Sequence, residues 1–72
     1  MIPDMKTIMS VNIASLGYSK DERKLYVQYY SGAIVRYSEI SKYDYETILS
    51  SSCIGTYIRR HIEGAYDSER IY

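Results

Sequence analysis

The sequence has no phenylalanine, no tryptophan, one proline and one cysteine among its 72 residues. The single cysteine, Cys53, cannot form an internal disulfide, and no set of Cys and His residues exists to hold a metal. No apolar run approaches the ~20 residues of a transmembrane helix, and no signal-peptide segment follows the N-terminus. A lone cysteine is typical of a reducing compartment. We therefore expect a cytoplasmic protein that contacts no membrane and needs no cofactor.

The chain also lacks a net charge and the length that a large core needs. Nine basic residues balance nine acidic ones, which argues against a broadly basic nucleic-acid binder. A chain this short forms one domain at most and buries only about 60–65% of its unfolded surface. Because no disulfide or metal adds stability, association is a reasonable source of it. The sequence therefore predicts a homo-oligomer.

Tyrosine is the one abundant aromatic residue, with ten copies. Each ring offers a large apolar area and a hydroxyl that needs a partner or water. Because a domain of this size cannot bury ten such side chains, several must lie at its surface. Exposed tyrosines are common in binding surfaces, so the composition favours a binding function.

Three segments have the residues and the alternation of β-strands, which predicts a β-meander: residues 12–18, 24–30 and 33–37. Gly17 indicates a bulge or a close backbone approach within the first strand. Gly32 marks the turn between the second strand and the third.

The register of the last two strands follows from their apolar residues. One face carries Leu25, Val27 and Tyr29 on the second strand, and Ala33, Val35 and Tyr37 on the third. These sets meet only if the connection has an odd number of residues, as in a three-residue loop with Gly32 in the left-handed conformation. A two-residue turn would instead pair Val27 with Arg36 and exchange the faces. We therefore predict that Val27 and Tyr37 are buried.

The opposite face carries Tyr26, Gln28, Ile34 and Arg36, with Tyr30 at the turn. This face is too apolar for ordinary contact with solvent and too polar for a core. Tyrosine rings and guanidinium planes stack on bases and on partner side chains. Tyr26, Tyr30 and Arg36 are therefore the preferred candidate site, unless helices or another subunit cover the face.

A first helix is predicted over about 42–53. Ser41 is a good N-cap, and Asp44 three residues later forms a variant of the capping box. Cys53 lies on the apolar stripe of this helix, so we expect it to be buried. Gly55 is expected to end the helix in the left-handed conformation.

A second short helix is predicted over 56–62, with Gly64 ending it. Residues 1–9 read equally as a short helix or an extended arm, and 65–72 as an irregular tail or a short edge strand. The predicted fold is α+β, with a short three-stranded antiparallel β-meander followed by two short helices packed on one face. The domain is expected to span 10–72.

Arg59, Arg60 and His61 form the only dense basic cluster. An arginine fork can bind a phosphate or a carboxylate, which makes Arg59 and Arg60 candidate binding residues. In the alternative, these cations only complement the helix dipole, and Arg59 pairs with Glu63 four residues later. His61 has no nucleophile or orienting carboxylate evident in the sequence, and no catalytic motif is present. We therefore expect a protein without enzymatic activity.

The order and spacing of several short motifs resemble a known family. These motifs are Ile13-x-x-Leu16-Gly17-Tyr18, the Gly32 turn, and Gly55-Thr56-Tyr57-Ile58 followed by Ile62, Gly64 and Tyr66. From about Ser10 to Tyr66, the chain resembles the KTSC domain, a small module also found at the C-terminus of some lysyl-tRNA synthetases. The central Tyr-x-Tyr of that family is here Val35-Arg36-Tyr37, an apolar exchange that indicates a structural role for the motif. The resemblance implies a meander followed by helices, in a free-standing protein of a bacterium or a phage.

Three functions stay open. The first is a non-enzymatic protein-interaction module, such as a phage-encoded regulator or inhibitor of a host system, which binds a host protein or a second copy in the cytoplasm of the bacterium or infected host. The second is a module that binds RNA or single-stranded DNA, which the synthetase context implies and the charge balance opposes. The third is an oligomeric nucleotide-binding sponge, with Arg and Tyr from neighbouring subunits around a small anion. Neutral charge and a mixed Tyr surface favour the first.

Overall fold

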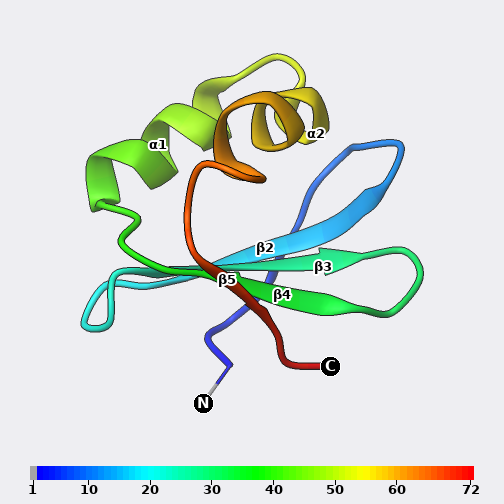
Figure 1. The fold of residues 1–72 in the computed structure, drawn as a ribbon. Helices are drawn as coiled ribbons and strands as arrows, with labels where there is room; N and C mark the ends of the chain where they lie inside the picture. Colours follow the sequence, from blue (N-terminus) through cyan, green and yellow to red (C-terminus); the bar gives the residue numbers. More distant parts are fainter. Residues whose placement is uncertain (1) are drawn as a thin grey trace.

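The computed structural model describes residues 2–72 as two layers, with a sheet covered on one side by helices (Figure 1). The strands are β1 (Lys6–Thr7), β2 (Ile13–Ser19), β3 (Lys24–Tyr29), β4 (Ile34–Tyr37) and β5 (Ser68–Arg70). They pair antiparallel in the order β1-β2-β3-β4-β5. The helices are α1 (Lys42–Ser50), α2 (Ile54–Tyr57) and the π-helix η1 (Ile58–Ile62), which continues α2. The predicted α+β class is therefore confirmed.

The register of β3 and β4 agrees with the prediction. Val27 pairs with Val35, which puts both on the core face. The Gly32 N–H donates to the Tyr29 carbonyl at 2.9 Å, and Gly32 has a φ of 97°, in the left-handed region. Val27 and Tyr37 are both buried. The three-residue connection and the assignment of the core face are confirmed.

The sheet has five strands, so the predicted number of three is wrong. β1 and β5 have two and three residues, all exposed, and they extend the sheet at its two edges. Strands this short and polar leave no alternation for sequence reasoning to detect. Of the predicted segment 1–9, residues 2–9 include β1 and no helix, and Met1 lies outside the described residues. The tail contains the edge strand that was one of its two predicted states.

Helix α1 begins as predicted and ends early. The Asp44 N–H donates to the Ser41 hydroxyl at 3.0 Å, and the Asp44 carboxylate accepts from the Ser41 N–H at 3.4 Å. The helix stops because Ser51 is extended, and the Ser51 hydroxyl accepts from the Cys53 N–H at 3.2 Å. Two predictions are therefore wrong: Cys53 is exposed rather than buried, and Gly55 lies inside α2 rather than at the end of a helix.

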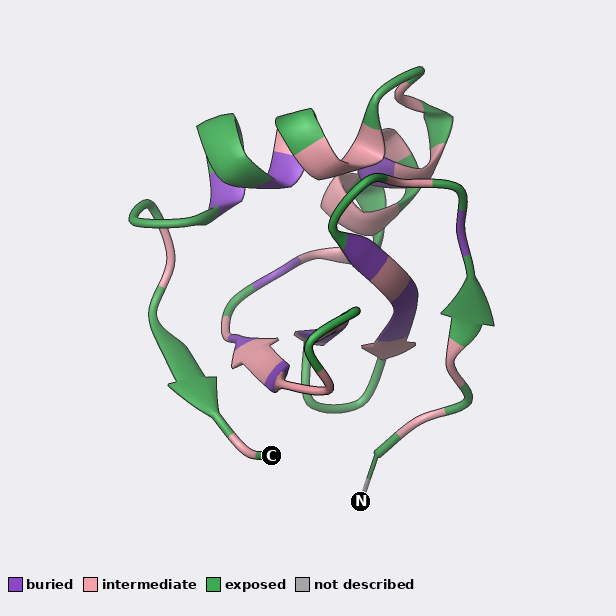
Figure 2. Cartoon of the chain, turned by 90° about the vertical axis from the view of Figure 1, so that its right-hand side faces the viewer, coloured by how far each residue is buried: buried purple, intermediate pink, exposed green. Residues whose placement is uncertain are grey.

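The second helical segment fastens the helical layer to the sheet. It begins at Ile54, slightly before the predicted start, and Ile58 and Ile62 are buried in the core. Gly64, with a φ of 81°, follows its end as predicted. In Figure 2, the buried segments lie on the inner strands and on the helical turns that face them.

Two tyrosines connect η1 to the sheet. The Tyr29 hydroxyl lies 3.2 Å from the Tyr37 hydroxyl and donates to the Glu63 carboxylate at 3.1 Å. Burial is the main cause that raises the pKa of Tyr29, and the Tyr37 hydroxyl and the Glu63 carboxylate raise it further. Burial also raises the pKa of Tyr37. Both side chains therefore stay neutral in the folded protein at a pH where exposed tyrosines ionise.

We expect the free energy of unfolding to fall as pH rises above about 10, where tyrosines of the unfolded chain ionise. Above that pH, the unfolded chain loses protons that folded Tyr29 and Tyr37 keep, so rising pH favours unfolding. Urea unfolding followed by circular dichroism at several values between about pH 8 and pH 11 measures this. Tyr29→Phe should make the alkaline decline shallower, whereas an unchanged slope in that variant would contradict the assignment.

Candidate functional site

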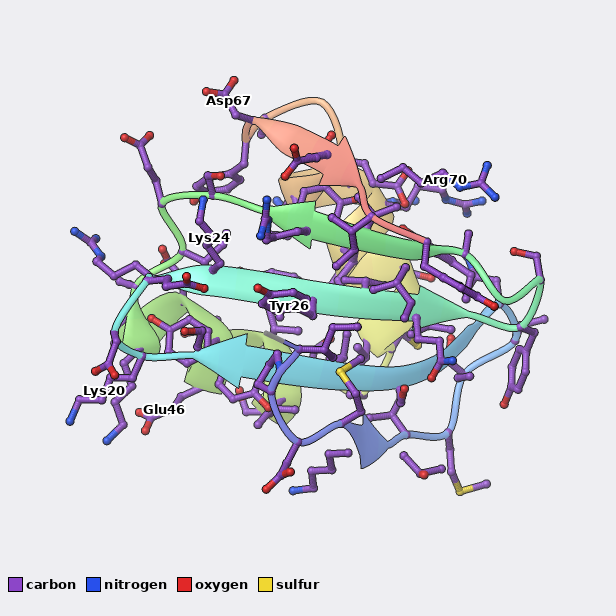
Figure 3. The ribbon with its side chains drawn as sticks, turned by 90° about the horizontal axis from the view of Figure 1, so that it is seen from below. Lys20, Lys24, Tyr26, Glu46, Asp67 and Arg70 are labelled. Carbon is purple, nitrogen blue, oxygen red and sulfur yellow. The ribbon has the colours of Figure 1, made fainter. Side chains whose placement is uncertain are left out.

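Tyr26 lies at the centre of the outer sheet face, which is the face away from the helices (Figure 3). It pairs with Gly17 on one side and with Arg36 on the other. The N-terminal segment fills the space above Gly17, where an added Cβ would lie 2.5 Å from Met5 Sδ and 3.1 Å from Pro3 Cγ. Only 1% of Tyr26 is exposed. The predicted orientation is confirmed, but the ring that was expected to be free for stacking is buried, and the N-terminal segment lies over its neighbour Gly17.

Arg36 is also engaged within the chain. Its guanidinium forms an ion pair with Glu69 of β5. The Tyr26 hydroxyl is the main cause that raises the pKa of Arg36, and the Glu69 carboxylate raises it further. The Tyr26 hydroxyl also donates to the Glu22 carboxylate at 3.4 Å. Tyr26 and Arg36 therefore join three strands of the outer face and the β2–β3 loop, and they do not form an open stacking platform.

Arg59, Arg60 and His61 lie on η1, on the helical side of the sheet (Figure 1). All three are exposed. The His61 ring packs against Tyr57 of the preceding turn, with ring centroids 4.6 Å apart. The sheet separates these arginines from the outer face. The predicted site residues therefore do not form one continuous Tyr/Arg surface.

Tyr30 is the predicted sheet residue that stays open to solvent, with 63% of it exposed. It lies in the β3–β4 turn, where its N–H donates to the Asn12 carbonyl at 3.2 Å. This bond holds Tyr30 next to the β1–β2 loop, residues 8–12. The loop and the turn lie at the same end of the molecule as α2, on the right of Figure 1.

An open cleft of about 430 Å³ lies between the β1–β2 loop and the beginning of α2. It is lined by Met9, Ser10, Val11, Asn12, Ser52, Cys53, Ile54, Gly55, Thr56 and Arg59. Its volume is in the range of ligand-binding clefts. Of the predicted site residues, only Arg59 contributes to its lining.

Close packing of α2 against the β1–β2 loop shapes the cleft. The Ser10 hydroxyl donates to Asn12 Oδ1 at 3.2 Å and accepts from the Ile13 N–H at 3.4 Å. A Cβ at Gly55 would lie 2.6 Å from Ser10 Oγ and 2.8 Å from Asn12 Oδ1. A glycine at this position lets α2 approach the loop, which explains the first residue of the Gly-Thr-Tyr-Ile motif.

Among residues 2–72, Met9 and Val11 are the most exposed of the large apolar residues, each with 98% of its surface open to solvent. Ile8, just before them, is buried in the core and anchors the loop. Sequence reasoning missed both residues. The available signal was the alternation of Met9 and Val11 with Ser10 and Asn12. That pattern does not say which residues of a loop face solvent.

The groups around the cleft are both polar and apolar. They offer hydroxyl and amide groups, one positive charge and apolar contact. Within residues 2–72, no three His, Cys, Asp or Glu side chains gather closely enough to hold a metal ion. In the same part of the chain, no helix has the length and apolar character needed to cross a bilayer.

A sequence model of the KTSC domain matches residues 9–66, which is most of the chain, so this protein belongs to the KTSC domain family. Its structure is similar to the crystal structure of a KTSC domain protein from Yersinia pestis, with a TM-score of 0.91 and 22% sequence identity. The similarity covers 96% of this chain and 97% of the other. At this identity, the structural likeness shows the fold alone. No sequence among curated proteins matches this chain.

Proposed function

We propose that this protein is a non-enzymatic protein-interaction module. Its binding surface is the cleft end, which comprises the cleft, with Met9 and Val11 in its lining, and the neighbouring Tyr30. The observation that carries the proposal is the 98% exposure of Met9 and of Val11 at the cleft. Covering apolar surface contributes about 25 cal/mol per Å². Apolar side chains next to hydroxyl and amide groups match the usual anatomy of a protein interface.

The residues of the outer sheet face are already engaged within the chain, which supports the cleft end as the binding surface. Tyr26 is buried and Arg36 is paired with Glu69, so both already have partners within the chain. A partner molecule would have to displace part of this chain to reach the Tyr26 ring, because only 1% of the residue is exposed. The cleft end needs no such rearrangement.

The other predicted functions stay predictions. A phosphate of RNA, single-stranded DNA or a nucleotide would find its donors in Arg59 and Arg60, which are exposed. The zero net charge supplies no general attraction for phosphates, so it favours a protein partner. Self-association, regulation of a host system by a phage and a cytoplasmic location likewise stay predictions.

Replacing Met9 and Val11 together with serine should abolish capture of the partner from host lysate and leave the fold intact. Because both side chains are almost fully exposed, the free energy of unfolding should change by less than about 0.5 kcal/mol. Tagged wild type and variant are compared in pulldowns with and without nuclease, followed by quantitative mass spectrometry. We expect at least one protein to be enriched about tenfold or more by the wild type over the variant, as loss of an interface anchor predicts.

Tyr43→Ser is the matched control, because Tyr43 is exposed on α1 and does not line the cleft. Circular dichroism and size-exclusion chromatography check that both variants fold. Equal loss of capture in Tyr43→Ser would contradict the assignment to the cleft end. Loss of capture on nuclease treatment would favour a nucleic-acid partner instead.

A further inference from the structure

The cleft contains one charged side chain, and it is a cation. Its lining includes Arg59 and no Asp or Glu. Within residues 2–72, the only salt bridge joins Arg36 to Glu69, so no carboxylate of the described chain neutralises Arg59. The charge of the cleft is therefore positive and open to an external anion.

The carboxylate nearest to Arg59 in sequence is turned elsewhere. Glu63 follows Arg59 by four residues, a spacing that favours an ion pair on a regular helix. Here the π-helix has ended, Glu63 is extended (φ −64°, ψ 127°), and its carboxylate accepts from the Tyr29 hydroxyl at 3.1 Å. The alternative prediction of an Arg59–Glu63 pair is therefore wrong. The sheet holds Glu63, and Arg59 keeps its donors for a partner.

The rim of the cleft argues for a polypeptide. Met9 and Val11 both line the cleft, and because 98% of each is exposed, both also offer apolar surface at its rim. A segment that enters the cleft and continues across its rim would cover both. The hydroxyls of Ser52 and Thr56 on the α2 side can bond the backbone of such a segment.

The cleft therefore offers one positive charge, on Arg59, together with the exposed apolar side chains of Met9 and Val11. Resting on the proposed function, we infer that the partner inserts an acidic–apolar segment, in which an Asp or Glu lies next to a large apolar residue. The carboxylate binds Arg59 through the planar guanidinium fork. The apolar side chain packs on Met9 and Val11.

Selection from a displayed library of random peptides tests this inference on the intact protein. Wild type, Arg59→Gln, Arg59→Glu, Arg60→Gln and Met9→Ser/Val11→Ser are immobilised, and the selected peptides are sequenced. Wild type should enrich peptides with Asp or Glu beside a large apolar residue. Arg59→Gln should lose the acidic preference, and Arg59→Glu should select Lys or Arg in its place. Arg60→Gln is the matched control, because Arg60 is the exposed neighbour outside the cleft lining, and it should select as wild type does.

The best wild-type peptide is then measured by fluorescence anisotropy. Arg59→Gln should weaken its binding by about ten- to a hundredfold, the effect of losing one charge-assisted hydrogen-bonded pair. Arg60→Gln should change it by less than about threefold, as a solvent-exposed charge does.

The outcomes separate the inference from the proposed function. If wild type selects peptides that depend on Met9 and Val11 but show no acidic preference, the inference fails and the proposed function stands. If no selected peptide depends on Met9 and Val11, both fail. AMP and inorganic phosphate are tested by thermal shift as small-anion probes. Stabilisation by either through Arg59, without peptide selection, would overturn the inference in favour of a small ligand.

Discussion

Replacing Tyr26 with alanine is expected to lower the free energy of unfolding by about 3–5 kcal/mol, the range for a large aromatic side chain removed from a core. Tyr26 is 1% exposed and pairs with Gly17, over which the N-terminal segment lies, so truncation leaves a cavity on the outer face. A chain of this length has a total stability of roughly 4–11 kcal/mol. Urea unfolding followed by circular dichroism should therefore show a large shift of the midpoint.

Two further variants test the cause of this loss of stability. Tyr26→Phe keeps the ring and loses the hydroxyl bond to Glu22, so a decrease of about 1 kcal/mol is expected. Tyr30→Ala should change stability by less than about 0.5 kcal/mol, because Tyr30 is mostly exposed in the β3–β4 turn. Equal effects of Tyr26→Ala and Tyr30→Ala would contradict the burial of Tyr26. Any binding defect of Tyr26→Ala has to be corrected for the fraction of unfolded protein.

Replacing Ile58 with alanine should lower the free energy of unfolding by about 2–5 kcal/mol. Ile58 is fully buried and belongs to the core that joins η1 to the sheet. A cavity at this position weakens the contact between the two layers, and this short chain has no disulfide to offset the loss. Helical signal in circular dichroism should disappear at a lower urea concentration than in the wild type.

Arg60→Ala is the matched control for Ile58→Ala, because Arg60 lies on the same π-helix and is exposed. Its effect should stay within about 0.5 kcal/mol. Ile58→Val, which removes one methylene, should cost about 0.5–1.5 kcal/mol. A loss below about 1 kcal/mol for Ile58→Ala would contradict the role of this residue as the anchor of the helical layer.

The face assignment in the central strands was predictable because it depends on a period of two. Placing Val27 opposite Val35 requires only the alternation and a three-residue turn with Gly32 in the left-handed conformation. The start of α1 was predictable for a similar reason, since Ser41 and Asp44 cap the helix through bonds within one turn.

The connection between the helices was harder to predict. The apolar pattern continues past the real end of α1, so Cys53 was expected in the core and Gly55 at a helix end. In the structure, the Ser51 hydroxyl binds the Cys53 N–H, and Gly55 packs against the loop at Ser10. The glycine is needed for that approach between segments far apart in sequence, which a helix-end pattern does not represent.

For the candidate site too, the direction of the side chains was predictable from the sequence, whereas their accessibility was not. Composition and alternation correctly put Tyr26 and Arg36 on the face away from the helices, because side-chain direction along a strand is a local property. Their accessibility was decided by segments from the two ends of the chain: Met5 lies over Gly17 beside Tyr26, and Glu69 pairs with Arg36.

The sequence by itself determined the properties that act over a few residues: strand faces, the Gly32 turn, the Ser41 cap and the absence of a disulfide. Only the tertiary structure decided which polar and aromatic groups stay free. Burial and pairing depend on contacts between distant segments, such as Glu63 with Tyr29. Those contacts leave Arg59 without a carboxylate partner and put Met9 at the rim of the cleft. Folding gives some polar side chains a partner within the chain and leaves others of the same residue type exposed.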